Sequence, residues 1–214
     1  MKTHTPLLRI FQESGGEITQ VSTFYDGYLI EKSIHRTDLG GDDLTQYLSK
    51  LLQHKIPIPI VQEIKETLSS FNKENSTTSY QLPDGQSINI GNERFHCLEP
   101  LFHPFLLGKE MLGLHQLVYS SIMKSDIDMR RDLYNNVVLS GGNTLLTGIE
   151  KRLENELKEM VPKTAKVKIV APNGRRWSSW LGASVFAHLE QWTRWISSKE
   201  YQEEGPAILY RKCR

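Results

Sequence analysis

Residues 137–149, which read VVLSGGNTLLTGI, constrain the fold of this chain more than any other stretch. The apolar run at 137–139 predicts a short buried strand, and the paired glycines after it allow a sharp backbone turn. Apolar residues then recur at helical spacing over 145–160, and Asn143 or Thr144 is the expected N-cap of that helix. A strand, glycine turn and helix start can direct backbone N–H groups toward an anion or a flat ring, although ordinary loops share the pattern.

Length, charge and cysteine content narrow the class of protein. A chain of 214 residues can bury one good core or two small lobes. Because 26 Lys and Arg balance 25 Asp and Glu, no net field favours nucleic acid or an anionic membrane. Cys97 and Cys213 are far apart, as expected for a reducing compartment without disulfides or zinc. No apolar leader and no run near the ~20 residues of a membrane span is visible, so we expect a soluble, intracellular protein.

Periodicity predicts the remaining elements, which include two hairpins. The first turns at Asp26-Gly27 and the second at the PDG sequence of residues 83–85. Asp42 or Asp43 is the expected cap of the first helix. The expected strands are 7–12, 18–24, 28–34, 79–82, 87–90 and 166–170, and the expected helical stretches are 42–52, 60–68, an interrupted 93–136, 145–160 and pieces beyond 175.

Five segments of the chain resemble actin nearly residue for residue, in the order in which actins have them. They are LPDGQ at 82–86, IGNERF at 90–95, SIMK at 121–124, VLSGG at 138–142, and GP at 205–206 followed by RKC at 211–213. Several matches in one order are more specific than any single motif. The resemblance runs from about Glu13 to Arg214 and covers the second half of an actin, while nothing corresponds to the first half.

The resemblance implies an α/β fold of the actin-like ATPase type, with a ribonuclease-H-like core. One large lobe would be present, together with a remnant of the other. Residues 1–39 and 110–176 would form the inner subdomain of that lobe, and residues 40–109 its outer helical subdomain. Residues 177–214 would be the C-terminal segment that returns to the incomplete first lobe.

The phosphate-binding loop of the family is altered in this chain. In actins a DSGDG loop holds the phosphates and the water shell of the metal, and the matching residues 13–17 read ESGGE. Glu17 replaces a glycine, and Gln20 replaces the histidine near the attacking water. A second phosphate loop and a water-positioning glutamine belong to the unmatched half. Hydrolysis needs positioned water and charge neutralisation together, so we expect no catalytic residue, no metal ligand and no enzyme activity.

The adenosine side of the family's site is better matched. Gln62 stands where the family has an arginine. The resemblance implies at most weak ATP or ADP binding with Mg, and no required cofactor. As an alternative, Lys65 and Glu66 form a solvated helix face and the glycines serve only the turn. The candidate nucleotide-binding residues are Ser14, Gly15, Gly41, Lys65, Glu66, Gly141, Gly142, Asn143, Leu145, Leu146 and Arg176.

Aromatic and apolar residues near the C-terminus indicate protein binding. All four tryptophans lie between Trp177 and Trp195, and each can bury ~150–250 Å². Phe105 and Leu106 match the loop that plugs between strands of actin filaments. The alternatives are a tail that refolds locally and a loop that simply packs on the surface. One wall of the family's protein-binding cleft matches Gly27, Leu181, Val185, Phe186, Leu189 and Trp195.

These expectations favour an actin-like cytoskeletal protein that acts by structural or protein–protein interaction. Its partners would be actin, other actin-like proteins or actin-binding proteins, without nucleic acid and without membrane insertion. Its location would be the cytoplasm and the cytoskeleton. Two alternatives stay open: a residual ATP- or ADP-binding member of the family able to join filaments, and a truncated actin-like product.

Overall fold

The computed structural model describes residues 8–53, 56–72, 77–189 and 195–212. The chain divides into two compact units, residues 1–177 (unit 1) and residues 178–214 (unit 2). Unit 1 contains a sheet and most of the helices, whereas the described part of unit 2 is helical.

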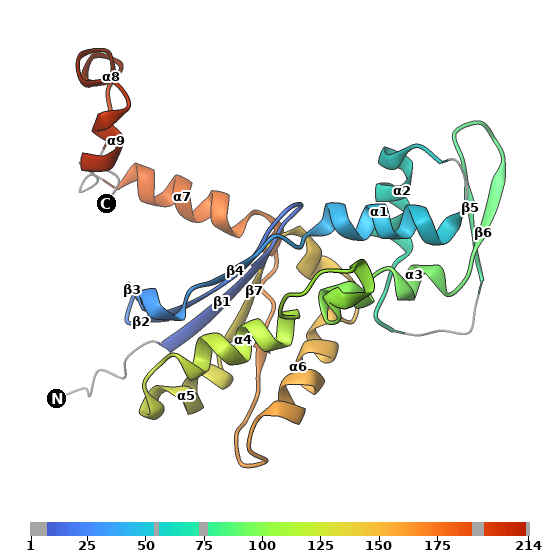
Figure 1. Ribbon diagram of the computed structural model, residues 1–214, viewed down its shortest axis with the longest axis horizontal. Coiled ribbons are helices and arrows are strands. Elements are labelled where there is room, and N and C mark those ends of the chain that lie inside the picture. The colour runs from blue at the N-terminus through green and yellow to red at the C-terminus, as the bar shows by residue number, and fades with distance from the viewer. Residues whose placement is uncertain (1–7, 54–55, 73–76, 190–194, 213–214) are drawn as a thin grey trace. The chain divides into compact units, whose positions relative to one another are not determined.

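A six-stranded mixed sheet forms the centre of unit 1 (Figure 1). The strand order is β3-β2-β1-β7-β8, and β4 also pairs with β2. Strand β1 runs antiparallel to β2 and parallel to β7, so β1 and β7 end at the same edge. The strands are β1 (Leu8–Ser14), β2 (Thr19–Tyr25), β3 (Tyr28–Leu29), β4 (His35–Thr37), β7 (Val137–Ser140) and β8 (Ile169–Val170).

The neighbouring strands β7 and β1 differ in burial. Strand β7 is buried at every position, which agrees with its continuous apolar run. Strand β1 alternates instead, with Leu8, Ile10, Gln12 and Ser14 buried. The expected strand at 166–170 is shorter than its pattern suggested, because only Ile169–Val170 pairs with β7.

The first predicted hairpin is only partly correct. Strand β2 pairs along its whole length with β1, whereas its pairing with β3 covers two residues. The 3₁₀ turn Glu31–Ser33 interrupts the expected return strand. Ser33 stabilises this turn, since its Oγ donates to the Ile30 carbonyl at 2.6 Å and accepts the Thr23 N–H at 3.1 Å. Strand β4 then resumes the pairing with β2.

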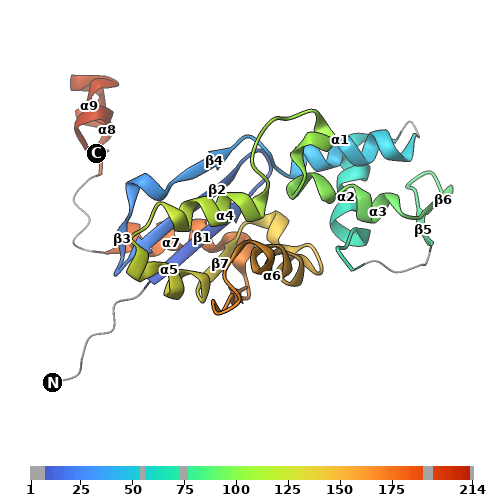
Figure 2. The ribbon, with the colours of Figure 1, turned by 60° about the horizontal axis from the view of Figure 1, so that its bottom comes forward.

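Helices α4, α5 and α6 pack around the sheet. Contacts join α4 to β2, α5 to β1 and α6 to both β8 and α4. Figure 2 shows the three helices beside the sheet. The helical stretch expected at 93–136 is interrupted, as predicted, by the 3₁₀ turns Glu99–Leu101 and Pro104–Leu107. The helices of unit 1 are α1 (Gly41–Leu52), α2 (Ile58–Leu68), α3 (Glu93–His96), α4 (Leu114–Met123), α5 (Ile127–Tyr134) and α6 (Ile149–Met160).

A second region of unit 1 contains α1, α2, α3 and a separate two-stranded sheet, at the right of Figure 1. The predicted hairpin is confirmed as β5 (Thr78–Gln81) and β6 (Ser87–Ile90). Helix α2 begins at Ile58, two residues earlier than its apolar pattern suggested. Pro59 lies in the first turn, where a missing N–H breaks no helical hydrogen bond.

One apolar core joins these elements. It includes Ile10 and Leu139 from the sheet, Leu44 and Ile64 from α1 and α2, and Ile122 from α4, all essentially inaccessible to solvent. The mixed α/β arrangement of a sheet and several helices agrees with the fold class that the resemblance implies.

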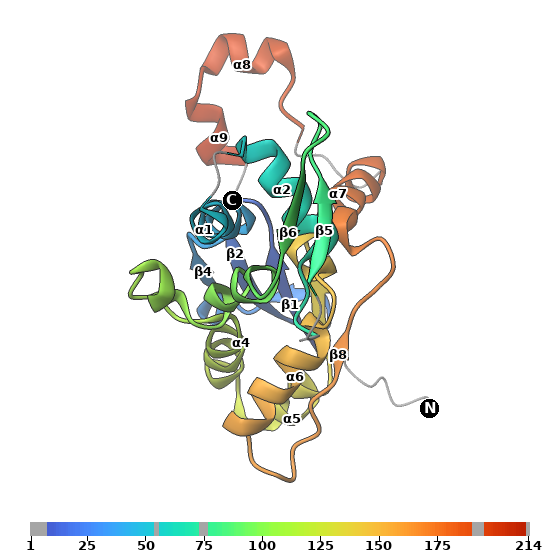
Figure 3. The same cartoon turned by 90° about the vertical axis from the view of Figure 1, so that its right-hand side faces the viewer.

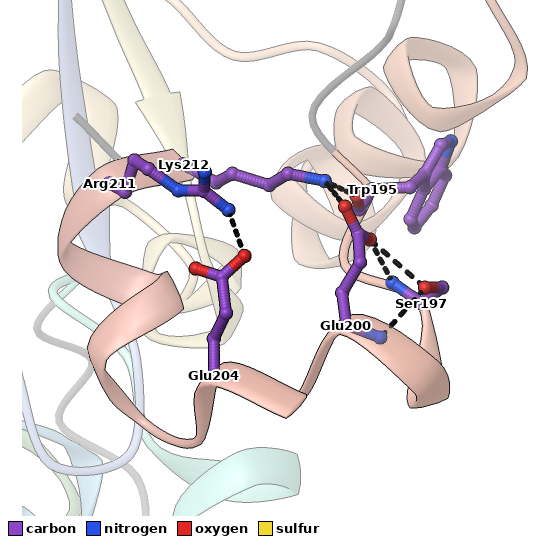
Figure 4. A network of polar contacts seen from close by, with 6 residues as sticks. All are labelled: Trp195, Ser197, Glu200, Glu204, Arg211 and Lys212. Carbon is purple, nitrogen blue, oxygen red and sulfur yellow. Dashed lines mark hydrogen bonds and ion pairs between the residues drawn. The ribbon is translucent and has the colours of Figure 1, made fainter. Parts of the chain in front are cut away.

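The described part of unit 2 forms three helices, and polar contacts join the last two of them (Figure 4). Lys212 Nζ donates to Glu200 Oε1 at 2.6 Å and to the Trp195 carbonyl at 2.7 Å. The Ser197 Oγ accepts the Glu200 N–H, which caps the second helix. Its helices are α7 (Ser178–His188), α8 (Ser198–Glu204) and α9 (Ala207–Lys212).

Across the described residues of both units, no helix combines the length and the apolar character that crossing a membrane requires.

Candidate functional site

A cavity of about 370 Å³ in unit 1 gathers residues that are far apart in sequence. It lies where β1 and β7 end and where α1 begins, with one face of α2 beside it. We refer to it as the Lys65 pocket. Its lining residues are Gly15, Gly16, Gly41, Asp42, Gln62, Lys65, Glu66, Gly142, Asn143, Leu145, Leu146, Arg176 and Trp177.

The parallel pairing of β1 with β7 creates this site. Glu13 is in register with Ser140, so the loops that follow the two strands leave the sheet side by side. Gly141 has a φ of +90°, and a Cβ on it would lie 2.3 Å from the Ser14 carbonyl oxygen. Only glycine tolerates both conditions, which explains the glycine directly after β7.

The N-terminus of α1 is held against the loop after β1. The Gly41 N–H donates to the Gly15 carbonyl at 3.0 Å, and the Asp42 N–H donates to the Gly16 carbonyl at 2.8 Å. The N-cap of α1 is Gly40 rather than Asp42 or Asp43. Asp43 still contributes, because its Oδ2 accepts the Gly40 N–H at 3.1 Å.

Lys65 is the most deeply buried charged residue that lines the pocket. Its side chain comes from α2, the residue is 3% exposed, and its Nζ donates to the Gly41 carbonyl at 2.9 Å. Burial lowers the pKa of Lys65, while the nearby Glu66 and Asp42 carboxylates oppose that shift. A lysine has three donors, so Lys65 can also bind an acceptor on a ligand. The alternative of a solvated helix face is therefore wrong for Lys65, although Glu66 is exposed.

Asn143 does not cap a helix as its sequence position suggested. Residues 142–145 form a 3₁₀ turn, and α6 starts only at Ile149. The Asn143 Nδ2 instead donates to Ser14 Oγ at 3.1 Å and to the Gly15 carbonyl at 2.6 Å. The side chain thus ties the loop after β7 to the loop after β1, and this contact between distant segments outweighs a local cap.

Most of the predicted nucleotide-binding residues come together in this pocket. Nine of the eleven line it, and the two exceptions are Ser14 and Gly141. Ser14 accepts a hydrogen bond from the lining residue Asn143, and Gly141 forms the turn directly after β7. Sequence reasoning missed Asp42 and Trp177 as lining residues. The only signal for either was adjacency in sequence to Gly41 and to Arg176.

The region expected to hold phosphates is acidic. A second cavity, of about 520 Å³, shares Gly15, Gly16 and Asp42 with the Lys65 pocket. Its remaining lining residues are Glu13, Glu17, Ile18, Gln20 and Arg36. Three carboxylates and one guanidinium thus line this cavity. Their net negative charge repels a polyphosphate rather than neutralising its charge. Among the described residues, no three His, Cys, Asp or Glu side chains are grouped so as to hold a metal ion.

The predicted plug residues are accessible. Phe105 is 69% exposed, and Leu106 is also exposed, both within the 3₁₀ turn Pro104–Leu107. Pro104 at the start of the turn is buried, and the ring of His103 lies 5.7 Å from the ring of Phe105. Phe105 and Leu106 therefore form an apolar tip above a packed base.

The residues of the predicted cleft wall divide between the two units. Gly27 occupies the turn between β2 and β3, with a φ of +87°. The others are exposed residues of unit 2: Leu181, Val185 and Phe186 on α7, Leu189 directly after it, and Trp195 two residues before the N-cap of α8. Of the tail tryptophans, Trp177 belongs to unit 1, and Trp192 lies outside the described residues, as does Cys213.

The chain matches a known protein family. A family model described as Actin matches residues 9–70 and 58–214. The two stretches overlap and together include every site residue named above.

Proposed function

The chain belongs to the actin family, and from this premise we propose that residues 1–214 act as an actin-like cytoskeletal interaction element that does not hydrolyse ATP. Unit 1 corresponds, in this proposal, to the second actin lobe, with residues 1–39 and 110–176 as its inner part and residues 40–109 as its outer part. Residues 177–214 correspond to the segment that packs on a first lobe. The cytoskeleton is the expected location, and actin or another actin-like protein is the expected partner.

The exposed apolar surface of α7 carries this proposal. The helix contains no Asp, Glu, Lys or Arg, and it buries none of its residues. Trp180 is 69% exposed and Leu181 is 58% exposed. A mostly apolar helix without a charged face is normally enclosed, so α7 favours a partner that covers it.

The acidic phosphate region supports the absence of hydrolysis. Phosphoryl transfer depends on cations that neutralise the developing charge on the phosphate oxygens. Arg36 is the one cation among the residues that line this cavity, opposite Glu13, Glu17 and Asp42. We therefore expect no release of phosphate from ATP above background.

Co-sedimentation with preformed actin filaments tests the interaction. We expect the 214-residue chain to pellet with filaments, and the variant Trp180→Ser/Leu181→Ser/Val185→Ser to remain largely in the supernatant. Phe105→Ser/Leu106→Ser tests the plug tip in the same way. Ile58→Ser, an exposed apolar residue on α2, is the matched control and should pellet as the parent does. Equal pelleting of all variants, or none by the parent, would contradict the proposal.

Residual nucleotide binding is the second candidate, and the Lys65 pocket favours it. Nine of the eleven candidate nucleotide-binding residues line one cavity, and Lys65 has donors to spare. The acidic phosphate region opposes tight binding of ATP. Thermal melting with Mg-ATP separates this candidate from the first, as set out in the Discussion.

A further inference from the structure

A groove of about 580 Å³ on unit 1 lies apart from the Lys65 pocket and from the plug tip. It is formed by α4, α5 and the loop that follows α6, which gather at the bottom of Figure 3. Apolar side chains make up much of its wall, and Met123 and Ile127 are exposed at its rim. The residues that line it are Tyr119, Met123, Ile127, Arg130, Arg131, Tyr134, Pro162, Thr164 and Ala165.

The charge of the groove is positive. Arg130 and Arg131 line it, and no acidic residue does. The guanidinium of Arg130 is oriented by the end of α4, because its Nε donates to the Ser125 carbonyl at 3.2 Å and its Nη2 to the Met123 carbonyl at 3.0 Å. Arg131 is exposed and forms no ion pair with any residue that the structure describes.

Tyr134 is the least expected member of the groove. The residue is only 5% exposed, yet its hydroxyl forms no hydrogen bond with any described residue. Among the described residues, the side-chain atoms that are buried without a partner do not include this hydroxyl, so it reaches the surface of the groove and can donate to a ligand there. Burial raises the pKa of Tyr134 to about 12; Tyr119 adds to the shift and Arg130 opposes it. The hydroxyl therefore lies near both of these groove residues and remains a donor at neutral pH.

We propose that this groove binds a small amphipathic carboxylate. The carboxylate accepts hydrogen bonds from the Tyr134 hydroxyl and from an arginine, which suits the two oxygens of one head group. The apolar body lies against Met123, Ile127 and the residues of the loop after α6. A volume of this size accommodates a ligand of a few to about twenty heavy atoms. The proposal does not depend on actin binding or on nucleotide binding.

Titration calorimetry of the full chain with octanoate, 1-octanol and octyl phosphate tests the proposal. Octanoate should bind, and 1-octanol, which has the same chain without charge, should bind about tenfold more weakly. Equal affinity for octanoate and 1-octanol would mean that the groove binds only the apolar chain, and it would overturn the proposal. Tighter binding of octyl phosphate than of octanoate would overturn the assignment of the head group. No heat from octanoate at millimolar concentration would overturn the whole inference.

Two variants assign the contacts. Tyr134→Phe removes only the hydroxyl and should weaken octanoate binding about tenfold, while the melting temperature without ligand stays equal or rises. Arg131→Gln removes one positive charge from an exposed position. It should weaken the binding of octanoate but leave the binding of 1-octanol unchanged. Tyr210→Phe, at an exposed tyrosine of α9, is the matched control and should change neither. A marked drop in the melting temperature of Tyr134→Phe, or unchanged octanoate binding in both variants, would contradict the assignment.

Discussion

Units 1 and 2 differ in how they are held together. Unit 1 encloses a continuous apolar core from the sheet to α1, α2, α4 and α6. In the described part of unit 2, Ile208 is the only buried residue, and polar contacts among Ser197, Glu200 and Lys212 link α8 to α9. Exposed ion pairs contribute little to stability, whereas apolar burial contributes most of it. Unit 1 therefore has an apolar core of its own, whereas the described part of unit 2 leaves most of its apolar side chains exposed.

The largest difference between the units should appear in the free energy of unfolding when one leucine in each unit is replaced by alanine. Leu139 on β7 is fully buried, and Leu209 on α9 is exposed. Leu139→Ala should lower the free energy of unfolding by about 3 kcal/mol through the cavity it leaves, whereas Leu209→Ala should change it by less than about 0.5 kcal/mol. Urea denaturation followed by circular dichroism measures both. Similar losses in the two variants would mean that unit 2 has a core of its own.

A pair of glycine substitutions should act in opposite directions. A Cβ at Gly141 would meet the Ser14 backbone in a left-handed conformation, whereas a Cβ at Gly182 in α7 would meet nothing within 4 Å. Gly141→Ala should cost about 2–3 kcal/mol. Gly182→Ala should stabilise the helix by about 0.5–1 kcal/mol. The same denaturation assay applies, and a destabilised Gly182→Ala would show that α7 is closely packed there.

The polar contacts of unit 2 predict an acid-sensitive region. The hydrogen bond from Lys212, followed by those from Ser197, lowers the pKa of Glu200 from 4.5 to about 2. Because the folded pKa is the lower one, this contribution is complete above about pH 4.5 and is lost as the pH falls toward 2. Carboxyl carbon NMR on the full chain should report the low pKa.

Lys212→Met is the matched test of this contact. It should return the Glu200 pKa toward 4.5, and high salt should do so in part, because the pair is partly exposed. A Glu200 pKa near 4.5 in the unmodified chain would contradict the structure of the α8–α9 contact.

The smallest expected effect is the change in melting temperature when Mg-ATP is added. If the dissociation constant of Mg-ATP is millimolar or weaker, millimolar ligand stabilises unit 1 by at most about 0.4 kcal/mol. The melting temperature should then rise by no more than about 1–2 °C. A rise of several degrees would favour the nucleotide-binding candidate. Phosphate release that Glu13→Ala abolishes would show hydrolysis and overturn the first proposal.

Local patterns were enough to predict much of the fold. The second hairpin, the helices α1, α2 and α6 and the buried strand β7 follow from periodicity and turn residues, and the structure confirms them with shifts at their ends. The return strand expected at 28–34 failed because the 3₁₀ turn Glu31–Ser33 interrupts its pairing with β2, which resumes only at β4. Strand periodicity predicts that a segment is extended, but it does not predict which residues pair or with which strand they pair.

In the candidate site, too, local features were predicted and contacts between distant segments were not. The glycines and Lys65 were identified from sequence because their matches are local, and they lie together as expected. The N-cap role expected of Asn143 was wrong because its side chain bonds instead to the distant Ser14 and Gly15, and Trp177 was not anticipated as a lining residue of the pocket. No local pattern distinguishes a side chain that caps its own helix from one that bridges two loops.

The sequence by itself determined the family, the alternation of strands and helices, and the apolar character of α7, because each is set by residue types close along the chain. Only the tertiary structure decided which side chains share a cavity and which polar groups lack a partner. The groove that joins Tyr134 and Arg130 of α5 to residues of α4 and of the loop after α6, and the burial of Lys65, arise from packing between elements remote in sequence.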